Sequence, residues 1–301
     1  MEPHVLARGD RGQPAPRGAT AEMRTLFRGL RVLGSFTADQ PQQTFTEIAR
    51  RAGVPKGTAH RFIAALERHG YLTRSPSGRG YILGLRVLEL GYAALRGLRV
   101  PDVALSYLER LAQETDESAS MAILDGTEVV YVARAPRRRL MSTNLTVGSR
   151  LPVYCSSIGK VILAFRDSAE VDALLSRIDF RPFTPYTVTS RRQFKRILAE
   201  TRRQGYSIND QEMELGLRSA AAPIWSSDGQ VIAGISIAMP PQRGPMGTLR
   251  GQFVPILLRT AREISDALRP LGPLLVLAQP TAAPLPARSL AGGAASAKGG
   301  K

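Results

Sequence analysis

The sequence predicts an α+β protein with two folded parts, a mainly helical N-terminal part and a larger part in which helices pack on an antiparallel sheet. At 301 residues the chain is long enough for two domains with a core each. Apolar residues recur at helical spacing in the first part. In the second, β-rich runs flank Asp125-Gly126 and again Asp228-Gly229, and helical patterns lie between these two pairs. Asp-Gly between such runs is a strong hairpin signal, and hairpins separated by helices favour a sheet covered by helices.

The composition divides the chain into five segments. Residues 1–21 have charge, Gly and Pro where a signal peptide needs an apolar stretch, and residues 271–301 are rich in Ala, Gly and Pro without a period. We expect both to be disordered. The folded segments are a first domain, linker helices and a second domain, over residues 22–84, 85–116 and 117–270. The pair Val100-Pro101 predicts the end of a linker helix.

The chain is strongly basic. Its 41 Lys and Arg outnumber 25 Asp and Glu, which gives a net charge of +16 and favours an anionic partner: nucleic acid, an anionic membrane surface or an acidic ligand. Apolar runs such as VIAGISIAM are far shorter than the roughly 20 residues that span a bilayer, so we expect no membrane partner. The single Cys155 and three scattered histidines predict no metal and no other cofactor, and fit a reducing cytoplasm.

The stretch TFTEIARRAG predicts the first helix of a helix-turn-helix. Thr44 and Glu47 have the spacing of a capping box, in which a hydroxyl and a carboxylate satisfy free N–H groups at the helix start. Gly53 can adopt the left-handed conformation that ends a helix. Pro55 suits the first position of a second helix, and the small residues Ala49 and Gly53 let the two helices cross closely.

The second helix has two faces. Ala59, Phe62, Ile63 and Leu66 recur at the spacing of a core-facing stripe. The opposite face is small or polar and carries Arg61, so it can enter a major groove and contact guanine edges or phosphates.

After this helix, two short β-rich runs flank the turn PSGRG, which is typical of the hairpin wing of a winged helix. Residues 22–86 hold 11 Lys and Arg against 4 Asp and Glu, a net of +7. A capping box with a glycine turn is common in helical proteins, but with the amphipathic helix and the basic wing it predicts binding to double-stranded DNA. For His60, a solvated surface position and a base contact are equally good interpretations. The predicted DNA-contacting residues are Thr44, Thr46, Lys56, Gly57, Thr58, His60, Arg61, Arg74 and Arg79.

The chain resembles IclR-type transcriptional regulators over residues 22 to about 265. The resemblance rests on TEIARRAGVPKGTAHRFIAALERHGYL, LGLRVLELGYAAL, VGSRLPVYCSSIGKVILA and GYSINDQEMELGLRSAAAPI, in this order. Within the family it is most similar to the branch that controls aromatic-acid catabolism through the β-ketoadipate pathway. The resemblance implies a winged helix-turn-helix, a linker helix and a GAF-like effector-binding domain. It also implies operator DNA, a small organic acid, a second copy of the chain in a homodimer or tetramer, and RNA polymerase as partners.

The resemblance further implies a ligand pocket between the sheet and the loop that leads into SSIGKVIL. Relatives that bind small acids carry a carboxylate, a thiol and a second serine where this chain has Asn209, Ser219 and Ala238, which argues against a glyoxylate-like acid. Matched by motif, the pocket positions are Leu140, Thr143, Leu151, Ser157, Ile158, Asn209, Ser219, Ser236 and Ala238.

The residues themselves suggest how a carboxylate could bind there. Ser156 and Ser157 start a helix with free N–H groups, which is a common anion site, and Arg150 lies just before it as a bidentate partner. We therefore expect an aromatic or related organic carboxylate. The arginine run at 137–139 is either a second partner or a solvated cluster.

Two other functions fit parts of the sequence. Cys155 with the serines after it can be drawn as the nucleophile of a hydrolase-like enzyme, but residues 117–270 contain no histidine as its base. A buried cysteine ahead of a helix is the simpler interpretation, so we expect no enzyme. A sequence-independent nucleic-acid binder would need no second domain of this size, and would show steep salt dependence without a preferred site.

Overall fold

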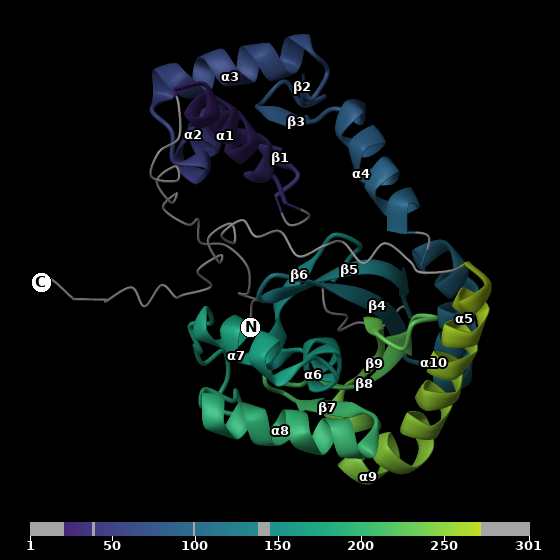
Figure 1. Ribbon diagram of the computed structural model, residues 1–301. Helices are drawn as coiled ribbons and strands as arrows, with labels where there is room; N and C mark the ends of the chain where they lie inside the picture. Colours follow the sequence, from purple (N-terminus) through teal and green to yellow (C-terminus); the bar gives the residue numbers. More distant parts are fainter. Residues whose placement is uncertain (1–20, 38–39, 99, 138–144, 272–301) are drawn as a thin grey trace, which may run out of the picture. The chain divides into compact units, whose positions relative to one another are not determined.

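The computed structural model describes residues 21–37, 40–98, 100–137 and 145–271, which are coloured in Figure 1. The chain divides into two compact units between Ala93 and Ala94. The predicted N-terminal arm and C-terminal tail lie, apart from one residue each, outside the described residues. Among the helices described, none has the length and hydropathy needed to cross a bilayer.

The N-terminal unit is a helix-turn-helix with a three-stranded wing. Its strands are antiparallel and lie in the order β1-β3-β2, and the β2-β3 hairpin is the predicted wing. This confirms the winged helix-turn-helix. Its elements are α1 (Ala21–Gly34), β1 (Gln42–Gln43), α2 (Phe45–Ala52), α3 (Lys56–Arg68), β2 (Leu72–Arg74), β3 (Tyr81–Leu83) and the first part of α4 (Leu85–Leu98).

The turn between α2 and α3 forms as the sequence predicts. Gly53 has a φ of 60°, and its N–H donates to the carbonyls of α2 that the helix end leaves free. Pro55 is the N-cap residue of α3. The sequence predicts it at the first helical position, which Lys56 occupies instead. Ala59 and Ile63 are buried against α2, so the predicted core stripe is confirmed. The Arg31 guanidinium of α1 donates to the Gly53 carbonyl at 3.0 Å and ties α1 to the turn.

The second unit contains one large sheet with helices on both faces. The predicted hairpins at Asp125-Gly126 and Asp228-Gly229 are confirmed as β4-β5 and β8-β9. The main elements are α5 (Val100–Thr115), β4 (Ser118–Asp125), β5 (Glu128–Ala135), β6 (Arg150–Pro152), α6 (Ser157–Ala164), α7 (Ser168–Ser176), α8 (Arg191–Gln204), β7 (Ser207–Asp210), β8 (Arg218–Trp225), β9 (Val231–Met239), α9 (Met246–Thr248) and α10 (Val254–Leu268).

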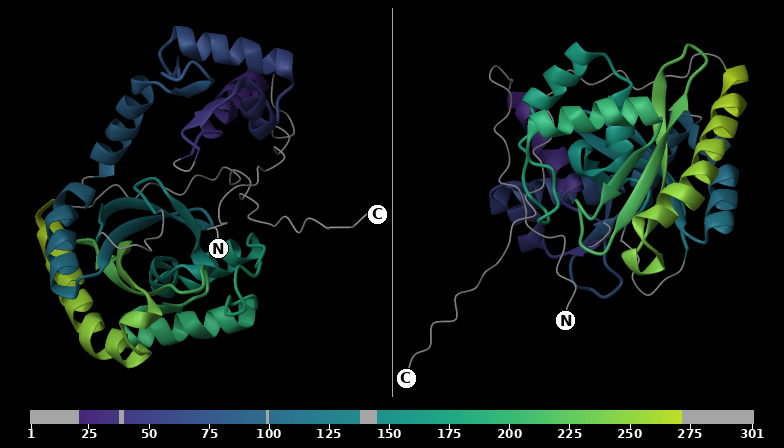
Figure 2. Two further views of the ribbon diagram at one scale, coloured as in Figure 1. Left: turned by 180° about the vertical axis from the view of Figure 1, so that it is seen from behind. Right: turned by 90° about the horizontal axis from the view of Figure 1, so that it is seen from below.

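The six strands are antiparallel in the order β6-β5-β4-β9-β8-β7. Helices α5 and α10 lie side by side on one face, and α6, α7 and α8 lie on the other (Figures 1 and 2). Because side chains alternate along a strand, each strand contributes to two apolar cores. Met121 and Ile235 pack toward α5 and α10, whereas Ala122 and Ala221 pack toward α6.

Helix α6 approaches the sheet very closely because two glycines allow it. A Cβ on Gly234 of β9 would lie 2.9 Å from the Ile158 side chain, and one on Gly159 would lie 2.4 Å from the Val153 carbonyl oxygen. A larger residue at position 234 would push α6 away from β9, and one at position 159 would collide with Val153 in the helical turn that precedes α6. The start of α6 is therefore held at a fixed place above β8 and β9.

Candidate functional site

The outer face of α3 carries the predicted base-contacting residues. Gly57, His60 and Arg61 are exposed on the side away from the buried stripe, and Lys56 is exposed at the first turn beside them. The His60 ring also packs edge-on against Phe45 of α2, with 6.1 Å between ring centroids. This face is accessible, basic and of low bulk, as major-groove contact requires.

Some of the other predicted DNA contacts have intramolecular roles. The Thr44 hydroxyl accepts a hydrogen bond from the Glu47 N–H at 3.4 Å, and the Thr44 backbone N–H donates to the Glu47 carboxylate at 2.8 Å, which completes the capping box. The Arg74 guanidinium forms an ion pair with Glu67 at 3.2 Å and lies over the Tyr81 ring. Thr46, Thr58 and Arg79 retain exposed surface, Thr58 the least of the three.

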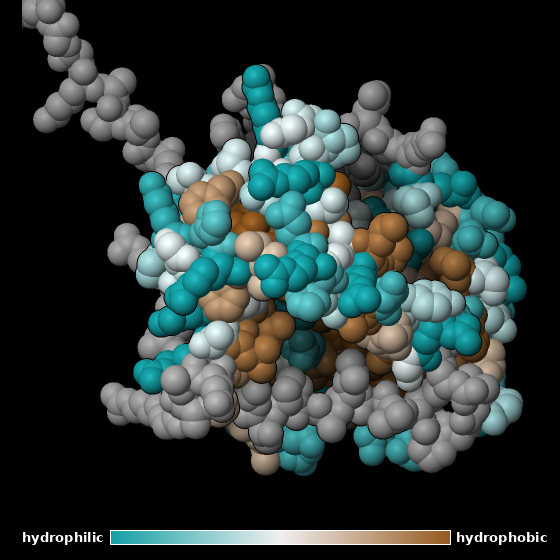
Figure 3. All heavy atoms as spheres, turned by 90° about the horizontal axis from the view of Figure 1, so that it is seen from above, coloured by the Kyte–Doolittle hydropathy of each residue, from teal (hydrophilic) through white to brown (hydrophobic). Residues whose placement is uncertain are grey.

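Apolar side chains are exposed on two helices of the N-terminal unit. On α1, Leu26 is 62% exposed, and on α4, Leu85 and Leu88 are 81% and 68% exposed. Tyr92 continues the α4 stripe one turn further on. Figure 3 shows brown apolar side chains at several places among the teal hydrophilic ones. Large contiguous apolar patches mark interaction sites, whereas single exposed apolar side chains are common on protein surfaces.

In the second unit, small polar residues gather on the sheet face that carries α6. The strand register aligns Ser118, Ala238, Ser219 and Asn209 across four strands. Ser219 and Ala238 keep some exposure although they lie in interior strands. The sheet face is therefore open to solvent beside the N-terminus of α6.

A second row of residues crosses the strands on the same face, two residues along each strand from the first row. Arg134, Ser120 and Ser236 occupy this row, and Ala221 and Ser207 continue it. The Ser157 hydroxyl of α6 lies 2.9 Å from the Ser219 hydroxyl. Ser156 caps α6 by accepting a hydrogen bond from the Gly159 N–H at 3.3 Å.

Two predicted effector residues have other roles in the structure. The Arg150 guanidinium contacts Asp125 at 2.5 Å and Glu128 at 2.6 Å. Both contacts occupy the guanidinium, and the predicted pairing of Arg150 with an effector carboxylate stays a prediction. Ile158 is fully buried against Gly234 in the core.

Other predicted positions are distributed differently. Leu151 is partly buried beside the same core as α6. In the arginine run, Arg137 donates its side chain to the Ala112 carbonyl at 2.9 Å. Leu140, Thr143 and the last two arginines of the run lie outside the described residues.

Asn209 is used to shape the site. Its amide donates to the Cys155 carbonyl, and its side-chain oxygen accepts from the Glu212 N–H at 3.1 Å. Both ends of the amide are therefore occupied, and Asn209 fixes the residue before the cap of α6.

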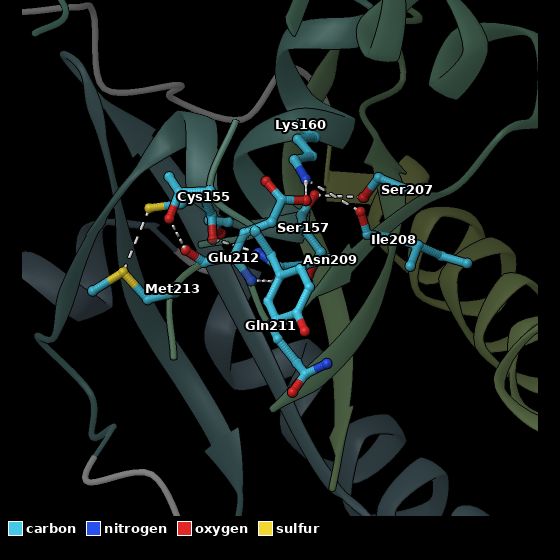
Figure 4. Close-up of polar contacts among 12 residues, drawn as sticks. Cys155, Ser157, Lys160, Ser207, Ile208, Asn209, Gln211, Glu212 and Met213 are labelled. Atoms are coloured by element: carbon cyan, nitrogen blue, oxygen red, sulfur yellow. Dashed lines mark hydrogen bonds and ion pairs between the residues drawn. The ribbon is translucent and has the colours of Figure 1, made fainter. Parts of the chain in front are cut away.

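A buried ion pair lies under the start of α6. Figure 4 shows the Lys160 ammonium pointing to the Glu212 carboxylate, with which it pairs, and it also donates to the Ile208 carbonyl at 3.2 Å. Lys160 has no exposed surface. Burial raises the pKa of Glu212, and Lys160 opposes that effect. Within the described residues, the second carboxylate oxygen of Glu212 has no hydrogen-bond partner. The pair fastens α6 to the segment after β7.

Cys155 is a buried thiol without the surroundings of a nucleophile. Burial raises its pKa, and the nearby Glu212 carboxylate acts in the same direction. Its sulfur lies 3.4 Å from the Met213 sulfur (Figure 4). A thiol that stays protonated is a poor nucleophile.

Two family models match the chain. The IclR helix-turn-helix domain matches residues 25–76, and the C-terminal domain of the bacterial transcriptional regulator IclR matches residues 92–266. The chain belongs to the IclR family. It is a ligand-responsive DNA-binding regulator rather than an enzyme, as the sequence predicts, and the hydrolase-like alternative is not supported.

Individual members of the family agree with this assignment. The Pca regulon regulatory protein of Pseudomonas putida is 35% identical, over 89% of this chain and 92% of its own length. A transcriptional regulator from Rhodococcus sp. RHA1 is 38% identical with a TM-score of 0.72, covering 81% of this chain and 98% of that one. An IclR homologue from Microbacterium hydrocarbonoxydans, crystallised with 4-hydroxybenzoate, is 34% identical with a TM-score of 0.71 over the same shares.

Sequence reasoning missed three residues of the site. Arg134 and Tyr131 lie in β5 and face α6, and Glu212 pairs with Lys160. In a regular strand, side chains alternate between the two faces of the sheet. Counting from the hairpin turn would therefore have placed only one of Tyr131 and Arg134 on the α6 face. A lysine in an otherwise apolar helix was the available signal for a buried partner.

Proposed function

We propose that this IclR-family regulator binds double-stranded operator DNA through α3 and the wing, and that an aromatic carboxylate bound beside α6 changes that binding. The proposed target genes serve the catabolism of such acids. The proposal places the protein in the cytoplasm, where operator DNA is found.

The DNA part of the proposal is supported by the exposed face of α3. Arg61 and Lys56 project from this face, and Arg79 lies in the turn of the wing. Arg61 can read a guanine edge, whereas Lys56 and Arg79 suit phosphates. The basic charge of residues 22–86 adds a sequence-independent attraction.

The effector part is supported by the open sheet face and by two relatives. Hydroxyls of Ser157 and Ser219 face each other there, beside free N–H groups at the start of α6. One relative is named for the Pca regulon, and another was crystallised with 4-hydroxybenzoate. An acid of this class is therefore the proposed effector.

The proposed assembly is a homodimer through the exposed apolar side chains of α1 and α4, and a tetramer would require a second contact. Leu26, Leu85 and Leu88 leave apolar surface that a second copy could cover. RNA polymerase remains a proposed partner, and the position of the operator relative to a promoter would decide between activation and repression.

Footprinting upstream of the protein's own gene tests this function. We expect a protected pseudo-palindrome whose half-sites lie one helical turn or a multiple apart. Protocatechuate or 4-hydroxybenzoate should shift the midpoint of protection. Uniform protection that disappears steeply with salt would instead favour a sequence-independent binder, and a specific site indifferent to every aromatic acid would exclude the proposed effector class.

A further inference from the structure

Arg134 differs from its neighbours in having no carboxylate partner among the residues that the structure describes. Its guanidinium makes one long hydrogen bond, 3.5 Å from Nη1 to the Ser120 hydroxyl. By contrast, Arg218 pairs with Asp210 at 2.8 Å, and Arg150 pairs with two acids. A partly buried cation in this sheet face is thus left with neutral neighbours.

A partly buried guanidinium with neutral neighbours is unfavourable in free energy unless an anion is present. Burial lowers the pKa of Arg134, and the neighbouring Tyr131 opposes the shift. Removing a guanidinium from water is costly when no opposite charge compensates for it. An anion that binds beside Arg134 would remove this cost, which makes the position favourable for anion recognition.

A β-bulge turns Arg134 and Tyr131 toward the same face. Ser120 pairs with Arg134, but Ala122 pairs with Tyr131, so β5 contains one residue more than β4 between these pairs. In a regular strand, residues three apart point to opposite faces. The extra residue brings both side chains to the α6 face.

Tyr131 links Arg134 to the start of α6. Burial raises the pKa of Tyr131 to about 12, so it stays a neutral hydroxyl, and the nearby Ser156, the cap of α6, acts on this pKa in the opposite direction. The Ser157 and Ser219 hydroxyls lie 2.9 Å apart on the same side of the sheet, where β4 and β9 separate β5 from β8. Among the described residues, Arg134, Tyr131 and the α6 cap therefore lie on one side of the sheet, and Arg134 carries the positive charge there.

We propose that Arg134 binds the carboxylate of the effector, an inference that rests on the function proposed above. A guanidinium fork matches the two oxygens of a carboxylate. One cation beside neutral hydroxyls suits a monoanion rather than a phosphate dianion, and Lys160 is already paired with Glu212. The Ser157 and Ser219 hydroxyls would then contact polar substituents of the ring.

Calorimetry on the full chain tests this assignment. The probes are benzoate, 4-hydroxybenzoate and protocatechuate. Each acid is compared with its neutral analogue, in which a primary amide replaces the carboxylate. For the acid that wild type binds best, Arg134→Met should weaken binding by at least about tenfold, the loss expected for a charge-assisted pair. The same variant should bind the matching amide within about twofold of wild type, which also shows that it is folded.

Arg150→Met tests the sequence-based assignment and should bind the acid like wild type, because Arg150 is paired with Asp125 and Glu128. Should the methionine variant not fold, Arg134→Gln takes its place with the same expectations. Equal acid affinity for wild type and the Arg134 variant overturns the role of Arg134 but leaves the proposed function intact. No binding of any acid to wild type overturns both.

Discussion

Gly57 lies on the exposed face of α3 that is proposed to contact DNA, and the space around it is empty. A Cβ added there would meet no atom within 4 Å. The absent side chain allows close approach of the backbone, and leaves contacts to the exposed Lys56 and Arg61. Gly57 is thus a position where a polar side chain can be added without strain.

Arg61→Ala should abolish operator binding in a gel shift, since a base-contacting arginine is worth about 1–3 kcal/mol in one half-site and a dimer has two. Gly57→Ser should preserve or strengthen binding, because the hydroxyl has room and because serine has a higher helix propensity than glycine. Arg68→Ala, at the far end of α3, is the control. Wild-type affinity of the Arg61 variant would contradict the assignment of this face.

The buried Lys160–Glu212 pair predicts strong energetic coupling. Glu212→Gln leaves a buried ammonium without its anion and should cost about 3–5 kcal/mol in the free energy of unfolding, as should Lys160→Met. The double variant should lose much less than the sum. Urea unfolding followed by fluorescence of Trp225, the chain's one tryptophan, reports on the second unit. Additive losses would show that the two side chains do not depend on each other.

At the scale of elements, α2 depends on its cap. Thr44→Ala should destabilise α2 by about 1 kcal/mol at pH 7. Hydrogen bonds from Thr44 lower the pKa of Glu47, so this contribution is present above the unfolded-state pKa of about 4.3 and is lost as pH falls through the folded-state value. Amide exchange in α2 should therefore differ between variant and wild type more at pH 7 than at pH 3. An equal difference in amide exchange at pH 7 and pH 3 would mean that the Glu47 carboxylate does not contribute to the stability of the cap.

Local signals predicted the elements that depend on local chemistry. The hairpins β4-β5 and β8-β9 follow from their Asp-Gly turns. The short strands β6 and β7 were missed, because three or four residues carry too little pattern and are stabilised by the strands beside them. Strand order was not derivable, because it depends on pairing between β4 and β9, far apart in the chain.

The same reasoning explains the candidate site. Ser156 and Ser157 were predicted because a helix start has a local signature. Arg134 was missed because its direction depends on a bulge, which is a property of the pairing between β4 and β5 rather than of β5 alone. Arg150 was predicted as a ligand because it lies just before the start of α6, and its ion pairs with Asp125 and Glu128 were missed because these partners are distant in sequence.

At the scale of the whole molecule, self-association should depend on one stripe of α4. Leu88→Glu should shift the proposed dimer toward monomer in sedimentation, because the charge would lie in the proposed contact. Leu90→Glu is a matched control, since Leu90 is 58% exposed and lies about 200° around the helix from Leu88. A dimer unaffected by Leu88→Glu would place the contact elsewhere.

The position of β4 beside β9 also determines when each unit can fold during synthesis. The buried core cluster of the N-terminal unit lies within residues 32–81, so this core can form as soon as they leave the ribosome. The second unit must wait for β9 to pair with β4 and for α10 to cover the sheet beside α5. We therefore expect the winged helix-turn-helix to be folded in nascent chains before the second unit has been fully synthesised.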